Sequence, residues 1–251
     1  MPVEVALSAT ERGGLTVYPL DGARELGVDA FVTSRDGGVS GGPYESLNLG
    51  LHVGDLDEHV IENRRRVAAA IGVTSLVTVR QVHAIHVVLV NGPLEEPVEA
   101  DGLVTDEADL ALAILVADCI PVLLIDRATS RFGVVHAGWR GLASGVLAAA
   151  VQQFAPEAAL HAFLGPAIAP EHYQIGPEVA QHFLDVPEAL LADRDDRSRL
   201  DLRHVATEQL LGLGLGANHI EVSRQSTGGP FFSDRAQRPC GRFALVAKRA
   251  S

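Results

Sequence analysis

Residues that can bind a transition metal recur near the ends of apolar segments in this 251-residue chain. His83 lies in RQVHAIHV, Cys119 in ADCIPVLLID, and His136 in GVVHAGWRG. Imidazole nitrogen and thiolate sulfur are donors that zinc binds, and three protein donors leave a fourth position open for water or substrate. The spacings of 36 and 17 residues are too wide for a zinc knuckle. Such a site must therefore be assembled by the fold from separate strands.

The same residue types permit other interpretations. A cysteine in an apolar run is often a small buried hydrophobic residue. Cys119 can also serve as a thiolate nucleophile with a histidine as its general base, and neighbouring Asp118 as a supporting partner or a general acid/base. The residues alone do not separate metal binding from nucleophilic catalysis, because both uses need the same sulfur. His86 follows His83 by three positions and points to the opposite face of a strand, so we expect it outside the site.

Composition excludes several classes of protein. The chain is 47% hydrophobic with a net charge of −12, and its longest basic run is Arg64-Arg65-Arg66, which we interpret as a solvated helix face. Nucleic acid is therefore not expected as a partner. No signal peptide is recognised, and the most apolar stretch is interrupted by Asp118 and Pro121. Two cysteines do not make a disulfide framework. We expect a cytoplasmic protein without membrane contact.

Hydrophobic periodicity predicts the elements that must position these residues. A glycine-rich stretch at 33–50 is expected to be a long ordered loop, since it lacks the ending of a phosphate-binding loop. Helices are predicted at 55–72, 139–155, 177–185 and 203–214. Strands are predicted at 76–90 (one or two), 110–118, 122–126, 131–138, within 161–170, at 219–226 and at 241–249. We predict a mixed α+β fold in one catalytic domain over 1–251: a layered sandwich of two mixed sheets flanked by helices.

Several longer motifs carry a resemblance to a known family. They are TSRDGGVSGGPYESLNLGLHVGD, RQVH, ADCIPVLL, VVHAGWRG, LGPAIAPEHYQIGPEV and PFFSDRAQRPCGRFALV. Together they resemble the laccase-domain family, also described as polyphenol oxidases or peptidoglycan editing factors. The likeness extends from about residue 30 to the C-terminus.

The resemblance implies one zinc ion on His83, Cys119 and His136. We predict Cys119, His136 and Asp118 as the catalytic residues, with Asp118 included because it adjoins the ligand cysteine. It implies phosphorolysis of adenosine, inosine and methylthioadenosine, together with deamination of adenosine. The alternative that the editing-factor name implies is a cysteine-dependent hydrolase or amidase acting on aberrant peptidoglycan precursors. The laccase label implies copper, which we discount because the chain lacks the histidine cluster of a full multicopper site.

Five further residues are predicted to bind substrate. Arg140 begins a helix just after His136, where a guanidinium can bind phosphate with paired hydrogen bonds. Arg35 and Arg242 are candidates for the same role or for bracing loops. Asn48 and Gln81 can orient substrate by hydrogen bonds or brace the loops that carry them.

The chain departs from the family pattern at one position near its C-terminus. The family has a cysteine before the threonine of QSTGG, where this chain has Ser226. Cys240 occurs where the family tends to have threonine. The three metal-ligand positions are unaffected, so we expect the chemistry to be retained without a thiol at 226. The sequence predicts no particular oligomeric state.

Overall fold

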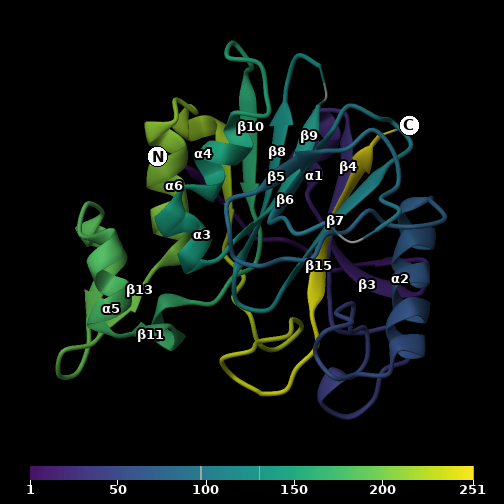
Figure 1. The fold of residues 1–251 in the computed structure, drawn as a ribbon, viewed down its shortest axis with the longest axis horizontal. Helices are drawn as coiled ribbons and strands as arrows, with labels where there is room; N and C mark the ends of the chain where they lie inside the picture. Colours follow the sequence, from purple (N-terminus) through teal and green to yellow (C-terminus); the bar gives the residue numbers. More distant parts are fainter. Residues whose placement is uncertain (97, 130, 251) are drawn as a thin grey trace.

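The computed structural model describes residues 1–96, 98–129 and 131–250; residues 97, 130 and 251 of the predicted domain lie outside the described part. Two sheets lie face to face between helices (Figure 1). Three helices cover the outer face of the larger sheet, and one long helix covers the outer face of the other. The predicted layered α/β fold is confirmed.

The larger sheet has seven strands with mixed pairing. Its central strands pair antiparallel, whereas the pairs at both edges are parallel. In spatial order the strands are β1 (Val3–Val5), β14 (Ile220–Ser223), β10 (Leu160–Leu164), β8 (Ile120–Asp126), β9 (Phe132–Ala137), β6 (Gly102–Thr105) and β5 (Val87–Leu89).

The second sheet has five strands, and every pairing in it is antiparallel. In spatial order they are β2 (Thr10–Arg12), β3 (Leu15–Pro19), β4 (Val28–Thr33), β15 (Phe243–Arg249) and β7 (Ala111–Val116). A third, small sheet near α5 comprises β11 (Gln174–Ile175), β13 (Ser198–Leu200) and β12 (Leu190–Ala192).

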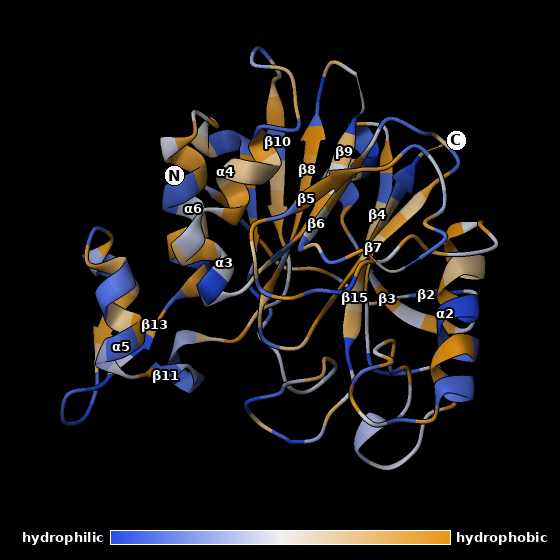
Figure 2. Cartoon of the chain, in the orientation of Figure 1, coloured by the Kyte–Doolittle hydropathy of each residue, from blue (hydrophilic) through white to orange (hydrophobic). Residues whose placement is uncertain are grey.

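The near-continuous apolar runs fold as strands that are buried on both faces. In β8, Ile120 and Val122 contact the helix layer, whereas Leu123 and Ile125 face the second sheet. Successive side chains of a strand point to opposite faces, so a strand between two layers must be apolar throughout. Figure 2 shows these inner strands as hydrophobic and the loops around them as mostly hydrophilic.

The helices are α1 (Asp21–Glu25), α2 (Asp57–Ile71), α3 (Trp139–Ser144), α4 (Val146–Val151), α5 (Pro177–Ala180) and α6 (Leu202–Gly212). Each predicted segment contains helix, but α1 was not predicted, and the segment 177–185 continues after α5 as a 3-10 turn. Gly72 ends α2 in the left-handed conformation, as expected of a C-terminal glycine. The single helix predicted over 139–155 is wrong, because Gly145 at φ 92° separates α3 from α4. Among the described residues, no helix is both long and apolar enough to cross a membrane.

The prediction for 76–90 is wrong over most of its length. Only β5 is a strand, and the preceding residues make isolated bridges at Val77 and Arg80. The glycine-rich segment is an irregular loop, as predicted, with one 3-10 turn at Gly42–Tyr44. Asn63 of α2 is fully buried beneath this loop and hydrogen-bonds four of its residues: Val39, Ser40, Ser46 and Asn48.

Candidate metal and anion site

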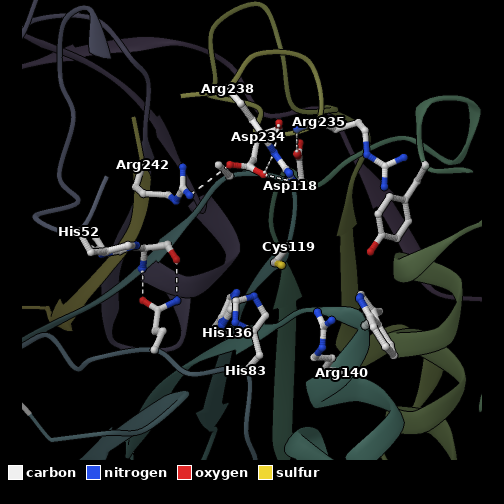
Figure 3. Close-up of a pocket in the computed structure, with 15 residues that line it drawn as sticks. His52, His83, Asp118, Cys119, His136, Arg140, Asp234, Arg235, Arg238 and Arg242 are labelled. Atoms are coloured by element: carbon white, nitrogen blue, oxygen red, sulfur yellow. Dashed lines mark hydrogen bonds and ion pairs between the residues drawn. The ribbon is translucent and has the colours of Figure 1, made fainter. Parts of the chain in front are cut away.

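A cavity of about 380 Å³ lies where the turn between β7 and β8, the end of β9 and the segment before β15 come together. Its lining combines histidines, one cysteine, aromatic rings and arginines, as the close-up in Figure 3 shows. The lining residues are His52, Gln81, His83, Leu115, Ala117, Asp118, Cys119, His136, Trp139, Arg140, Tyr173, Asp234, Arg235, Arg238 and Arg242.

His83, Cys119 and His136 converge at the floor of this cavity (Figure 3). One ligand atom from each lies within 4.8 Å of the others, and the two imidazole rings meet edge to face at 4.7 Å. The strand register brings two of them together: Pro121 of β8 pairs with His136 of β9, and Cys119 lies just before β8. His86 does not belong to this group and instead contacts the Glu99 carbonyl at 2.8 Å.

A buried carboxylate from outside the cavity lining orients two of the three ligands. Asp101 is fully buried and accepts a 2.8 Å hydrogen bond from Nδ1 of His136. This contact leaves Nε2 of His136 free to bind a metal. The same carboxylate accepts hydrogen bonds from the backbone N–H groups of Val82, His83 and Ala84 at 2.7–3.2 Å. Burial alone would raise the pKa of the Asp101 carboxyl, but these donors hold it below its usual value.

The backbone at His83 adopts a conformation that residues other than glycine rarely take. Its φ is 60°, in the left-handed region, so the segment depends on the carboxylate beneath it. Gly138 is equally constrained by its surroundings. A β-carbon there would lie 2.7 Å from Sγ of Cys119 and 3.2 Å from the His83 ring. Glycine therefore permits the ligands to approach each other so closely.

Half-buried Cys119 and buried His136 shift each other's protonation. Burial alone would raise the pKa of the Cys119 thiol, but His136 and His83 lower it to about 6. Burial alone would lower the pKa of His136, but Cys119 and Asp101 raise it to about 9. Both shifts favour a thiolate beside an imidazolium. A thiolate is the form of cysteine that binds metals and attacks electrophiles.

The donor set fits a transition metal. Metal–nitrogen and metal–sulfur bonds of about 2.0–2.3 Å place two ligand atoms roughly 3.3–3.6 Å apart around one tetrahedral ion. The observed limit of 4.8 Å is about 1 Å longer, so the side chains must move closer together to bind one ion. In the described part of the chain, His83, Cys119 and His136 form the only group found that can hold a metal.

Asp118 fixes the polypeptide that forms the opposite wall. Its φ is 90°, and its carboxylate accepts hydrogen bonds from the hydroxyls of Thr227 and Ser233 and from the backbone N–H of Arg235. Both carboxylate oxygens are thus engaged, and the side chain is 8% exposed. These contacts support a positioning role for Asp118 rather than the acid/base role considered from the sequence.

Arginines dominate the cavity wall. Asp234 forms ion pairs with Arg238 at 2.6 Å and with Arg242 at 3.3 Å. Arg140 and Arg235 have no carboxylate partner within the described residues. Their guanidinium groups lie over the rings of Trp139 and Tyr173, at 4.3 and 5.0 Å respectively. Stacking holds each cation in place while its edge N–H groups remain able to bind an anion.

Three of the five predicted substrate-binding residues line the cavity, and two do not. Arg140 and Arg242 line the cavity, and so does Gln81, although its amide is paired in both directions with the backbone of Leu115. Arg35 and Asn48 do not line it. Arg35 stacks on Phe232 and donates to the Glu45 carbonyl, while Asn48 is fully buried and braces Gly50 and Arg242. Their positions do not support the substrate contact expected of them.

Sequence reasoning missed several cavity residues and the main positioning residue. Asp234, Arg235 and Arg238 lie in PFFSDRAQRPCGRF, a motif whose spacing gives no sign that it reaches the metal ligands. Asp101 had a weak signal, namely a single acidic residue beside the apolar strand β6. Ser226 lines a second hollow of about 600 Å³, which shares Arg235 with the cavity around Cys119.

Comparison with known proteins identifies the family of the chain. Residues 29–250 match a family model described as "Multi-copper polyphenol oxidoreductase laccase". The chain belongs to this family. The resemblance noted from the sequence motifs is thereby confirmed.

Relatives and solved structures cover nearly the whole chain. It is 38% identical over 228 residues to the purine nucleoside phosphorylase YfiH of Escherichia coli, covering 87% of this chain and 92% of that protein. It is 35% identical over 232 residues to a purine nucleoside phosphorylase of Haemophilus influenzae, covering 87% and 93%. The crystal structure of YlmD from Geobacillus stearothermophilus superposes with a TM-score of 0.89 at 32% identity, covering 98% and 99% of the two chains.

Removing any one of His83, Cys119 and His136 should remove the metal. We expect His83→Ala, Cys119→Ser and His136→Ala each to lower bound metal, measured by elemental analysis of the purified protein, by at least tenfold. His86→Ala is the matched control and should keep the metal, since His86 lies outside the group. Loss of metal in His86→Ala but not in His83→Ala would show that His86, rather than His83, is the ligand.

Asp101→Asn should weaken metal binding without touching a ligand. An amide cannot accept from His136 and from three backbone N–H groups together, so metal affinity should fall about 10–100-fold. The thermal midpoint should also fall, because buried donors lose their partner. Competition with a chelator measures the affinity, and exposed Asp109→Asn serves as the control. Wild-type affinity in Asp101→Asn would contradict the positioning role.

Proposed function

We propose that this chain is a zinc-dependent purine nucleoside phosphorylase that acts on adenosine, inosine and methylthioadenosine and also deaminates adenosine. The observation that carries the proposal is one cavity in which a His/Cys/His donor set faces two arginines without carboxylate partners. Phosphorolysis needs the arginines of this cavity, because phosphate must be held beside the sugar carbon that loses its base. The family and the names of the relatives above favour the same activity.

In phosphorolysis, a phosphate oxygen bonds to the anomeric carbon of the sugar while the bond from that carbon to the purine nitrogen breaks. The products are a pentose 1-phosphate and the free base. Arg140 and Arg235 are the residues proposed to hold the phosphate. Arg242 is a weaker candidate, since Asp234 already neutralises it. Arg35 lies outside the cavity lining and is therefore not among the residues proposed to hold the phosphate.

Zinc on the three ligands would act as a Lewis acid and would lower the pKa of water toward neutrality. Deamination of adenosine needs such activated water, which replaces the amino group of the purine as ammonia leaves. Asp101 fixes the orientation of His136, and Gly138 keeps the approach between the ligands open. One group of three donors suits a single zinc ion better than a multicopper cluster.

One observation favours a second candidate function. The lowered pKa of Cys119 beside His136 is also what a cysteine-dependent hydrolase or amidase needs. In that case a histidine would serve as a base rather than as a ligand. The two proposals differ in metal dependence: the hydrolase would be active without metal and would be inactivated by a thiol alkylator.

Product analysis of zinc-loaded protein incubated with adenosine, with and without phosphate, tests the proposal. Adenine that appears only with phosphate demonstrates phosphorolysis, and inosine demonstrates deamination. If neither adenine nor inosine is formed, the proposal is contradicted.

Arg140→Lys should reduce phosphorolysis at least tenfold, with zinc content and melting temperature close to wild type. Lysine keeps the charge but loses both the paired hydrogen bonds and the stacking on Trp139. The rate as a function of phosphate concentration provides the measurement. Full activity in this variant, or a collapse in stability, would assign Arg140 to the fold instead.

A further inference from the structure

The three consecutive arginines of α2 do not share one environment. Arg65 is exposed and pairs with Glu62 at 2.7 Å. Arg66 pairs with Glu62 at 2.8 Å and also donates to the Gly37 carbonyl. Arg64 instead lines a hollow of about 450 Å³. The solvated helix face inferred from the sequence therefore applies to Arg65 but not to Arg64.

Arg64 is a cation without a counter-ion. It donates from Nε to the Leu49 carbonyl at 2.8 Å and makes a long 3.5 Å contact from Nη1 to the Thr78 hydroxyl. A guanidinium has five N–H groups, so three remain without a partner among the described residues. Burial lowers its pKa, and no acidic residue contributes to that shift. An anion that binds beside such an unpaired, half-buried guanidinium stabilises it.

The hollow around Arg64 is separate in its lining from the metal cavity. The two share only His52, and no metal ligand lines the hollow. Its walls are largely apolar, with Leu51, Leu76 and Leu94 among the lining residues. Exposed Glu95 and Glu96 also line it, and neither forms an ion pair with Arg64. Arg80 lines it as well, but its charge is paired with Glu99 at 2.8 Å. These two carboxylates repel a doubly charged ligand such as phosphate more strongly than a singly charged one.

The geometry points to a second binding site at Arg64, for a monoanionic carboxylate carried on an apolar group. The carboxylate would pair with the unused N–H groups of Arg64, and the apolar group would fill the space beside the leucines. This inference does not depend on the proposed nucleoside chemistry, because none of the metal ligands or stacked arginines lines the hollow.

The test is a titration of the full-length, metal-loaded protein with benzoate, followed by two-dimensional NMR of backbone amides. Saturable shifts are expected in residues 75–80 and 94–96, which line the hollow. Benzyl alcohol, which lacks the charge, and inorganic phosphate, which lacks the apolar group, should bind at least tenfold more weakly. Shifts confined to Arg140, Arg235 and their neighbours would place benzoate in the metal cavity and overturn the inference.

Matched variants assign the site to one arginine. Arg64→Gln should weaken benzoate binding at least tenfold, whereas Arg65→Gln, its exposed neighbour, should leave it unchanged. Ser75→Tyr provides a second variant if Arg64→Gln fails to fold, since Ser75 is exposed and its tyrosine would obstruct the hollow. Equal weakening in Arg65→Gln, or undiminished binding in Ser75→Tyr, would overturn the site.

Discussion

The Asp101 carboxylate accepts a hydrogen bond from the His136 ring and from three consecutive backbone N–H groups of residues 82–84. Through these contacts one buried charge sets the orientation of one metal ligand and the backbone shape that presents another. Cys119 then completes the group, because the pairing of β8 with β9 brings the residues before β8 beside His136. The strained φ of His83 is maintained by the same interaction.

A second buried carboxylate links the metal ligands to the arginine wall. Asp118 adjoins Cys119 in sequence and binds the segment that carries Asp234 and Arg235. The distance between the ligand group and the anion-binding groups is therefore set by one compact turn. The chain carries a net charge of −12, yet four arginines line this cavity. Such a local positive field attracts anionic ligands that the rest of the surface repels.

Much of the fold could be predicted because it has local signals: apolar runs such as that of β8 predict buried strands. The convergence of His83, Cys119 and His136 was expected from the family resemblance, since the residue types alone left metal binding and nucleophilic catalysis open. Long-range contacts had no such signal. The backbone around His83 is held by Asp101 rather than by strand pairing. The strand that the β-branched residues of 76–90 predicted is therefore absent around His83. The break at Gly145 shows that a glycine adopting a left-handed conformation can override helical periodicity.

The central claim is that one zinc ion binds to one sulfur and two imidazole nitrogens of this chain. X-ray absorption spectroscopy at the zinc edge of the purified protein tests it most directly. We predict about one mole of zinc per chain, with one sulfur near ~2.3 Å and nitrogen or oxygen neighbours near ~2.0–2.1 Å. In Cys119→Ser the sulfur contribution should disappear. Zinc surrounded only by nitrogen and oxygen in the wild-type protein would contradict the account.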